Sequence, residues 1–226
     1  MKPARIVAIV HSDTDVPGSL PELFAEQGVD LEIRSITRPL IAPEELTGLV
    51  VMGSPESAYD SRLPWLASEL AWLREVQRKE IPTWGICFGS QLLSRALGGS
   101  VHKNSSAEIG WTPLTLLGDE WGHEGPWLNF HFDAFTVPPD ATLLAKTDLA
   151  PQVFKQGKAI GMQFHPEIDT AMFDTWTRYW SSTEEGKRFL QTAGDLPERM
   201  RAEIQDRQPD NKTNCRNLVK DFLDLV

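Results

Sequence analysis

One cysteine of this sequence lies in a setting suited to nucleophilic catalysis. Cys87 belongs to the motif Gly-x-Cys-x-Gly-x-Gln at residues 85–91, between an apolar run typical of a strand and a pattern typical of a helix. A nucleophile on a tight strand-to-helix turn has strained backbone, and small residues two positions to either side relieve the crowding. The start of the helix contributes partial positive charge, which favours thiolate over thiol. The alternative is that Cys87 is a small buried apolar residue, the commonest fate of an intracellular cysteine.

A histidine and a glutamate that could activate this thiol lie at the end of a later apolar run. Residues 163–167 read Gln-Phe-His-Pro-Glu, and their spacing places His165 and Glu167 on the same side of an extended chain. Cysteine catalysis requires a base that accepts the thiol proton and a carboxylate that fixes the tautomer of that base. Taken alone, such a triplet is commonly a turn with a solvated carboxylate. Its catalytic interpretation therefore depends on its pairing with Cys87.

A glycine-containing loop offers main-chain amides for a third part of the site. The apolar residues 50–52 are followed by Gly53 and Ser54. Ligands of parallel sheets gather at the carboxyl ends of the strands, so this loop should converge with the cysteine and histidine segments. Amides of the loop could then hold an oxyanion, although an ordinary turn into the next helix has the same local pattern.

The elements that must position these residues alternate along the first part of the chain. Short β-branched runs, bounded by turn residues, alternate with helical patterns, which predicts an α/β fold with a mostly parallel central sheet flanked by helices. The expected strands are residues 5–10, 31–36, 46–52 and 81–86, and the expected helices are residues 20–27, a segment that begins at Pro64 and a segment that follows Cys87.

The pattern changes after residue 99. Turns separate short extended runs, which predict antiparallel or mixed strands. We expect Trp121 and Trp127, in a polar loop, to be exposed and able to cap the mouth of a site. The C-terminal third has helical spacing, and we expect one domain over residues 1–181 with a helical extension, residues 182–226, packed on it. The extended runs are residues 112–117, 134–137, 152–155 and 159–164.

Composition excludes several classes of protein. The chain has 226 residues, with 22 Lys and Arg against 32 Asp and Glu, and a formal charge of −10. No basic run offsets this charge locally, so we expect no nucleic-acid partner. No stretch approaches the roughly 20 apolar residues that cross a bilayer, and the apolar run at residues 6–10 is too short for a signal peptide. The two cysteines could form at most one disulfide, so they give no sign of an oxidising compartment. We expect a cytoplasmic protein without membrane contact.

Together, these motifs resemble the class I, or triad-type, glutamine amidotransferase domain. The cysteine motif at residues 85–91 and the histidine segment at residues 163–167 occur in the order and approximate spacing of that family. The resemblance covers about residues 5–180. It is closest to free-standing members similar to the amidotransferase portion of GMP synthase, and more distant to γ-glutamyl peptidases. Further similar segments are residues 53–60, 108–111 and 130–138.

The resemblance implies a flavodoxin-like fold and a specific reaction. Cys87 would attack the side-chain amide of glutamine, form a γ-glutamyl thioester and release ammonia. His165 would act as general base and then as general acid, and Glu167 would orient it. The amides of Phe88 and of the Gly53–Ser54 turn would form the oxyanion hole.

The resemblance also implies which residues hold the amino-acid end of the substrate. Gln91 would hold that end, and the segment 130–133 would present main-chain groups to it. The family usually has a small residue after the histidine of this segment, whereas this chain has Phe132, followed by Asp133. We expect the ring of Phe132 to point away from the pocket. A rotation at Cα lets the main chain face the substrate while the side chain is directed elsewhere.

Several functions stay open on these observations. The main interpretation is an enzyme without a cofactor that hydrolyses glutamine. The alternatives are a hydrolase of other γ-glutamyl peptides or amides, and a catalytically silent regulatory homologue, which Phe132 favours. A subunit that supplies ammonia to a separate synthetase is a further interpretation, because we see no room for a nucleotide-binding acceptor domain. The five histidines form no His-x-x-x-His pair, and we expect no metal site.

Overall fold

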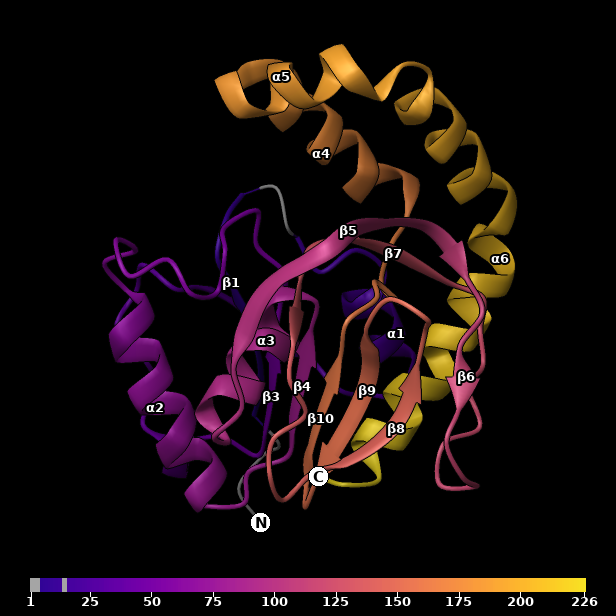
Figure 1. The fold of residues 1–226 in the computed structure, drawn as a ribbon. Coiled ribbons are helices and arrows are strands. Elements are labelled where there is room, and N and C mark those ends of the chain that lie inside the picture. Colours follow the sequence, from indigo (N-terminus) through magenta and orange to yellow (C-terminus); the bar gives the residue numbers. More distant parts are fainter. Residues whose placement is uncertain (1–4, 14–15) are drawn as a thin grey trace.

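A sheet of eight strands forms the centre of the structure, a computed structural model that describes residues 5–13 and 16–226 (Figure 1). The five neighbouring strands β2, β1, β3, β4 and β10 run parallel, and β9, β8 and β6 continue the sheet in antiparallel fashion. The predicted mixed, mostly parallel sheet is confirmed. In spatial order the strands are β2 (Leu31–Ser35), β1 (Ile6–Val10), β3 (Gly48–Val51), β4 (Thr83–Ile86), β10 (Ala159–Met162), β9 (Pro151–Gln156), β8 (Thr142–Lys146) and β6 (Thr115–Leu116).

Helices cover both faces of this sheet, and β1 shows why. Its residues Ile6 and Ala8 belong to a core with α1 and α6, whereas Val7 and Ile9 belong to a second core with α2 and α3. Successive side chains of a strand point to opposite faces of the sheet. A parallel strand with helices on both faces of the sheet is therefore apolar on both faces. The helices are α1 (Leu20–Glu26), the 3-10 helix η1 (Pro43–Glu45), α2 (Leu66–Arg78), α3 (Phe88–Ala96), α4 (Thr170–Ser182), α5 (Glu184–Ala193) and α6 (Leu196–Leu223).

The register of the parallel strands brings the three chemical motifs to one edge. Val51 of β3 lies beside Gly85 of β4, and Gly85 lies beside Gly161 of β10. The segments that follow these strands therefore emerge together at the carboxyl edge of the sheet. The cysteine motif, the Gly53 loop and the histidine segment start from this edge, as the sequence predicts.

Two longer strands, β5 (Val101–Thr112) and β7 (Trp127–Phe135), form a separate antiparallel ribbon. The ribbon arches between the sheet and helices α4 and α5 (Figure 1). The sequence pattern predicts only the short runs 112–117 and 134–137 in this region, so it does not indicate most of the ribbon. Residues 102–106 are polar and largely exposed, and they lack the apolar alternation by which a strand is detected.

The expectation that Trp121 and Trp127 are exposed is wrong. Their side chains are buried, with 6% and 1% exposure. Both indole N–H groups donate to the carbonyl oxygen of His123 at 3.1 Å, and the ring of Trp127 stacks on Phe164 with centroids 4.8 Å apart. The loop therefore satisfies the polar end of each indole internally, which permits burial. These tryptophans cannot cap the mouth of the site.

The helices α4, α5 and α6 form an arm that rises beside the ribbon and returns to the sheet (Figure 1). The end of α6 joins the core, where the ring of Phe222 lies 6.1 Å from Phe24 and 5.9 Å from Trp84 between centroids. The predicted division at residue 181 falls within α4 and stays a prediction. Of the helices in the described residues, none is long and apolar enough to cross a membrane.

Candidate active site

Cys87 occupies a strained turn between β4 and α3. Its backbone has φ 51° and ψ −111°, a left-handed conformation that is costly for a residue with a Cβ and persists only where the surroundings impose it. The surroundings include β10, because the N–H of Cys87 donates to the carbonyl oxygen of Met162 at 2.8 Å. The side chain is 7% exposed. The thiol is thus held at the carboxyl edge of the sheet in the geometry of a nucleophile elbow.

The two glycines of the cysteine motif are required by close approach. A Cβ on Gly89 would overlap the main-chain carbonyl of Val51, and a Cβ on Gly85 would lie 2.6 Å from the carbonyl oxygen of Gly89. Neither obstacle is a flexible side chain that could move aside. The crowding expected from the sequence is therefore present, and it fixes the start of α3 against β3.

His165 and Glu167 form a buried pair next to this thiol. The Nδ1–H of His165 donates to Oε1 of Glu167 at 2.9 Å, and the two side chains are only 3% and 0% exposed. A carboxylate can only accept, so this contact places a proton on Nδ1 and leaves Nε2 able to accept a proton from the neighbouring thiol of Cys87. The backbone N–H of His165 donates to Leu128 of the ribbon at 2.8 Å. The ribbon therefore helps to hold the imidazole in place.

Electrostatics favour the charged form of this imidazole. Burial by itself lowers the pKa of His165, but the neighbouring Cys87 and Glu167 outweigh burial and raise this pKa well above its ordinary value. An imidazolium between a thiolate and a carboxylate is the ion-pair state that activates a cysteine nucleophile. The arrangement can take up a thiol proton and return it to a departing group.

The loop after β3 and the start of α3 lie beside Cys87. Ser54 and Phe88 line the same cavity as Cys87, whereas Gly53 does not belong to the described lining. The carbonyl oxygen of Gly53 instead accepts a hydrogen bond from Nδ1 of His11 at 3.2 Å, and the ring of His11 packs edge-on against Phe88 at 4.9 Å. Of the predicted oxyanion residues, Gly53 and Phe88 thus both contact His11, and Ser54 lies in the lining of the cavity.

Gln91 and Asp133 meet on another side of the cavity. The side-chain amide of Gln91 donates to the carbonyl oxygen of Asp133 at 3.2 Å and to Oε1 of Gln163 at 3.3 Å. The carboxylate of Asp133 accepts from the hydroxyls of Ser57 at 2.7 Å and Tyr59 at 3.2 Å. Both predicted substrate residues line the cavity, and Gln91 is anchored to the protein, which fixes the main chain around Asp133.

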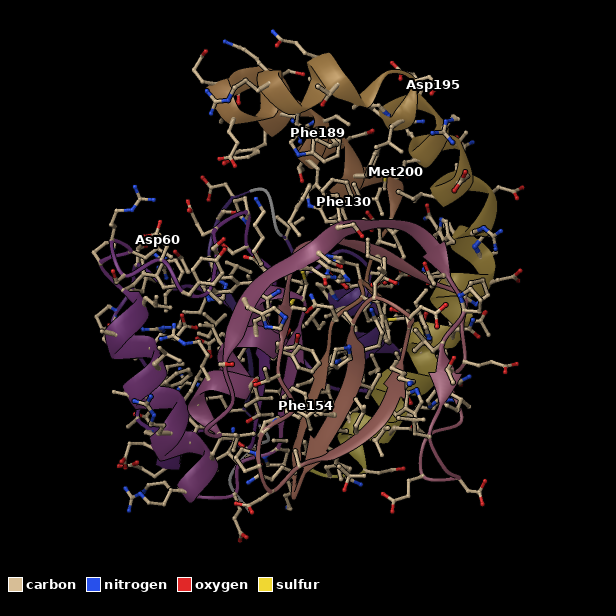
Figure 2. All side chains as sticks on the ribbon, viewed as in Figure 1. Asp60, Phe130, Phe154, Phe189, Asp195 and Met200 are labelled. Carbon is tan, nitrogen blue, oxygen red and sulfur yellow. The ribbon has the colours of Figure 1, made fainter. Side chains whose placement is uncertain are left out.

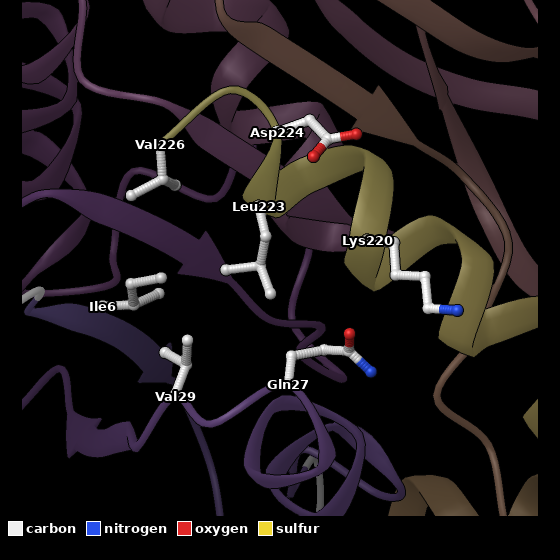
Figure 3. Close-up of a pocket in the computed structure, with 7 residues that line it drawn as sticks. All are labelled: Ile6, Gln27, Val29, Lys220, Leu223, Asp224 and Val226. Atoms are coloured by element: carbon white, nitrogen blue, oxygen red, sulfur yellow. The ribbon is translucent and has the colours of Figure 1, made fainter.

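Phe132 lies at the mouth of the cavity. Its side chain is 47% exposed and its ring meets Phe130 edge-on at 5.9 Å. Phe132 is one of the residues that line the cavity, whose volume is about 420 Å³. A second hollow of about 340 Å³ is lined by Ile6, Val29 and the end of α6 (Figure 3). It lies at the amino end of β1, on the edge of the sheet opposite to Cys87, and its described lining contains neither cysteine nor histidine.

Two further buried histidine–glutamate pairs escaped the sequence analysis. Nε2 of His11 lies 2.9 Å from Oε1 of Glu69, both side chains being fully buried. Nε2 of His131 lies 3.0 Å from Oε2 of Glu108, and Nδ1 of His131 donates to the carbonyl oxygen of Asp133 at 2.9 Å. The available signal was weak: His11 follows an apolar strand, and Glu69 interrupts the apolar face of a helix.

The described residues contain no cluster of three or more His, Cys, Asp or Glu that could hold a metal ion. Cys215, the other cysteine, lies in the core and is fully buried. Burial raises the pKa of the Cys215 thiol, which disfavours a nucleophilic thiolate there.

Comparison with known proteins identifies the family of this chain. A sequence model of class I glutamine amidotransferases matches residues 12–176, more than half of the chain. The chain belongs to this family. It is 30% identical over 177 residues to the glutamine-hydrolyzing GMP synthase of Mycolicibacterium paratuberculosis, covering 74% of this chain and 32% of that protein. It is also 32% identical over 175 residues to the glutamine-hydrolyzing GMP synthase of Thermus thermophilus, and this match covers 68% of this chain and 32% of that protein. This amidotransferase chain therefore spans about a third of these relatives.

Solved structures resemble the amidotransferase chain over almost its whole length. The crystal structure of a glutamine amidotransferase from Thermotoga maritima matches with a TM-score of 0.87 and 26% identity, covering 98% of this chain and 99% of that one. A glutamine amidotransferase from Methylobacillus flagellatus matches with a TM-score of 0.83 and 22% identity, covering 100% of this chain and 96% of that one. At this identity the match supports the fold alone. The flavodoxin-like fold that the motifs implied is confirmed.

Proposed function

We propose that this amidotransferase hydrolyses the side-chain amide of glutamine through a Cys87–His165–Glu167 triad. The observation that carries the proposal is the strained turn of Cys87 beside a buried histidine whose Nδ1 is 2.9 Å from a buried carboxylate. Strained backbone at the nucleophile, and a thiol, an imidazole and a carboxylate placed side by side, recur in sites where a cysteine attacks an acyl group. Family membership supports amide hydrolysis as the chemistry of this site.

The proposed reaction has two halves. Cys87 loses its proton to Nε2 of His165, and its sulfur attacks the amide carbon. The C–N bond then breaks as His165 returns the proton to the leaving nitrogen, which gives ammonia and a γ-glutamyl thioester. Water, activated by the same imidazole, attacks the thioester and releases glutamate and the free thiol. Glu167 stabilises the imidazolium throughout.

Main-chain amides would stabilise the charge on the attacked oxygen. Phe88 offers an amide at the start of α3, where the helix dipole adds positive potential, and the Gly53–Ser54 turn offers amides from the end of β3. The contact from His11 to the carbonyl of Gly53 supports this role, because it fixes the peptide that follows.

We place the amino-acid end of glutamine against Gln91, Phe132 and Asp133. Lys103 lies directly opposite Asp133 in the ribbon register, and both line the cavity. One cation and one carboxylate in this position complement the α-carboxylate and α-ammonium of the substrate. The main chain of Phe132 and Asp133 adds hydrogen-bonding groups at the same end.

The proposed amidotransferase domain comprises residues 1–181, with residues 182–226 as a helical extension. A separate synthetase subunit is the partner we propose for ammonia transfer. The matched GMP synthases support this role, since the chain covers 32% of their length. A cytoplasmic location also stays a prediction.

Ammonia release from glutamine by the purified chain tests the proposal. Wild type should release ammonia and glutamate in equal amounts, and Cys87→Ala should lose this activity. Cys215→Ala is the matched control, because it removes the other thiol from a buried site and should retain turnover. Equal activity of Cys87→Ala and wild type would contradict the proposed nucleophile, and loss of activity in both variants would point to a folding defect instead.

A further inference from the structure

The cavity of this amidotransferase extends beyond what glutamine would occupy. Its volume of about 420 Å³ falls among the roughly 300–1,000 Å³ of pockets that hold drug-sized ligands. One end carries the charged pair Lys103 and Asp133, which suits the zwitterion of an amino acid. The lining also includes five aromatic side chains, called the aromatic wall below: Phe130, Trp176, Tyr179, Trp180 and Phe189. Beyond its amide nitrogen, free glutamine has no apolar group that could use such a wall.

The aromatic wall begins at the histidine of the active site. The ring of Trp176 meets His165 edge-on, with centroids 5.0 Å apart. Phe130 lies 5.5 Å from Trp176 and stacks on Trp180 at 5.2 Å. Phe189 of α5 extends the wall, at 5.9 Å from Phe130 and 5.0 Å from Trp180. Figure 2 shows Phe189 of the arm next to Phe130 of the ribbon.

The position of this wall corresponds to one part of the substrate. In the proposed reaction His165 protonates the leaving nitrogen, so that nitrogen must lie next to the imidazole. The amino-acid end lies on the side of Gln91 and Asp133, which are joined by a hydrogen bond of 3.2 Å. A group attached to the leaving nitrogen would therefore extend past His165 toward Trp176. In glutamine this position holds only hydrogen.

We propose, on the basis of the amide hydrolysis proposed above, that the aromatic wall binds an apolar substituent on the leaving nitrogen. The preferred substrate is then a γ-glutamyl amide of an arylalkyl amine. Cys87 attacks the γ-carbonyl, the C–N bond breaks, and His165 delivers the proton to the departing amine. Hydrolysis of the thioester by water yields glutamate, so one amide and one water give glutamate and one amine.

The location of the wall in the sequence supports a role in selectivity. The family match ends at residue 176, whereas Tyr179, Trp180 and Phe189 lie beyond it. These residues belong to α4 and α5, outside the part of the chain that carries the shared amide chemistry. An apolar surface beside a common reaction centre is a means of choosing between substrates that share the reacting group.

Attachment of the arm does not require the whole wall. Leu190 and Leu196 also pack in the apolar cluster that joins the arm to the ribbon, and neither lines the cavity. Phe130 and Phe189 are partly buried like these leucines, but they form part of the lining of the cavity. Leu190 therefore provides a matched control on the same helix.

Two substrates that differ by one phenyl ring test the inference. γ-Glutamyl-ethylamide and γ-glutamyl-phenethylamide have the same alkylamine leaving chain, and the second adds a ring that would reach the wall. Wild type should show a kcat/KM at least tenfold higher for the phenethylamide, since one added methylene in an apolar pocket is already worth about tenfold or more. Phe189→Ala should lower this preference at least about fivefold, whereas Leu190→Ala should preserve it.

Binding to the Cys87→Ala protein separates this inference from the proposed reaction. Calorimetry should give a Kd for the phenethylamide at least about tenfold below that of the ethylamide. Tighter binding without any turnover by wild type would refute the reaction and retain the wall as a binding site. Turnover of glutamine and of both amides with equal kcat/KM, together with equal Kd values, would overturn the inference and retain the reaction. An equal loss of preference in Phe189→Ala and Leu190→Ala would also overturn it.

Discussion

Replacement of Glu167 by glutamine tests the proposed role of the buried carboxylate. Oε1 of Glu167 accepts from Nδ1 of His165 at 2.9 Å, and the side chain is fully buried. Glutamine has nearly the same shape, so the change removes the charge without opening a cavity. Among the described residues, Oε2 of Glu167 has no hydrogen-bond partner. The new amide can therefore present either its oxygen or its nitrogen to the imidazole.

The two orientations set the limits of the expected loss. With the oxygen toward His165, the tautomer is kept and only the charge assistance is lost, about 1.5–3 kcal/mol, or roughly 10- to 150-fold in kcat. With the nitrogen toward Nδ1, the ring proton moves to Nε2, the imidazole cannot accept the thiol proton, and the loss approaches about 10⁴-fold. We therefore expect kcat to fall at least about tenfold. KM should change little, because Glu167 is fully buried behind His165.

Amide hydrolysis at saturating substrate measures this effect, and thermal unfolding of the same samples checks that the variant is folded. Glu167→Asp is the control variant, because it keeps the negative charge and should retain more activity than Glu167→Gln. A folded Glu167→Gln protein with kcat within about twofold of wild type would refute the proposed function of the carboxylate.

Three further outcomes follow from the same geometry. His165→Ala should lose more activity than Glu167→Ala, since the first removes proton transfer and the second leaves a mispositioned imidazole; steady-state kinetics of both folded variants test this order. Iodoacetamide should label Cys87 in the native protein and Cys215 only after unfolding, because burial raises the pKa of Cys215; peptide mapping that finds Cys215 labelled first would contradict this. The raised pKa of His165 contributes stability that is fully present below the pKa of an unfolded histidine, about 6.5, and is lost as the pH rises through the raised value. Free energies of unfolding measured in denaturant at a series of pH values upward from about pH 6 should show this loss in wild type, and a smaller one in His165→Ala.

Much of the proposed site could be predicted because its signals are local. The cysteine motif combines a strand, a turn and a helix within residues 85–91, and the crowding at Gly89 is a direct consequence of that turn. His165 and Glu167 are two positions apart, so their contact needs only a local segment, which in the structure is a turn beyond the end of β10 rather than an extended chain. The parallel register then brings both segments to one edge of the sheet, as strand–helix alternation predicts.

The parts that could not be predicted depend on contacts distant in sequence. The β5–β7 ribbon is held by pairing between the largely polar β5 and the mostly apolar β7, and its irregularity between Lys103 and Glu108 hides the alternation further. The burial of Trp121 and Trp127 depends on one carbonyl oxygen, that of His123. Local polarity predicts exposure for such residues, and only the folded loop reverses it.

The histidine pairs show the same distinction between local and distant contacts. Of the three buried histidine–glutamate pairs, the predicted one joins residues 2 apart, whereas His11 and Glu69 are 58 apart and Glu108 and His131 are 23 apart. In each of the distant pairs the second ring nitrogen bonds a main-chain carbonyl, so both nitrogens already have partners within the protein. Neither nitrogen of those rings is left to face the thiol. The ring of His165 instead lies next to the thiol of Cys87, and this difference in partner distinguishes the proposed base from two histidines that hold main chain.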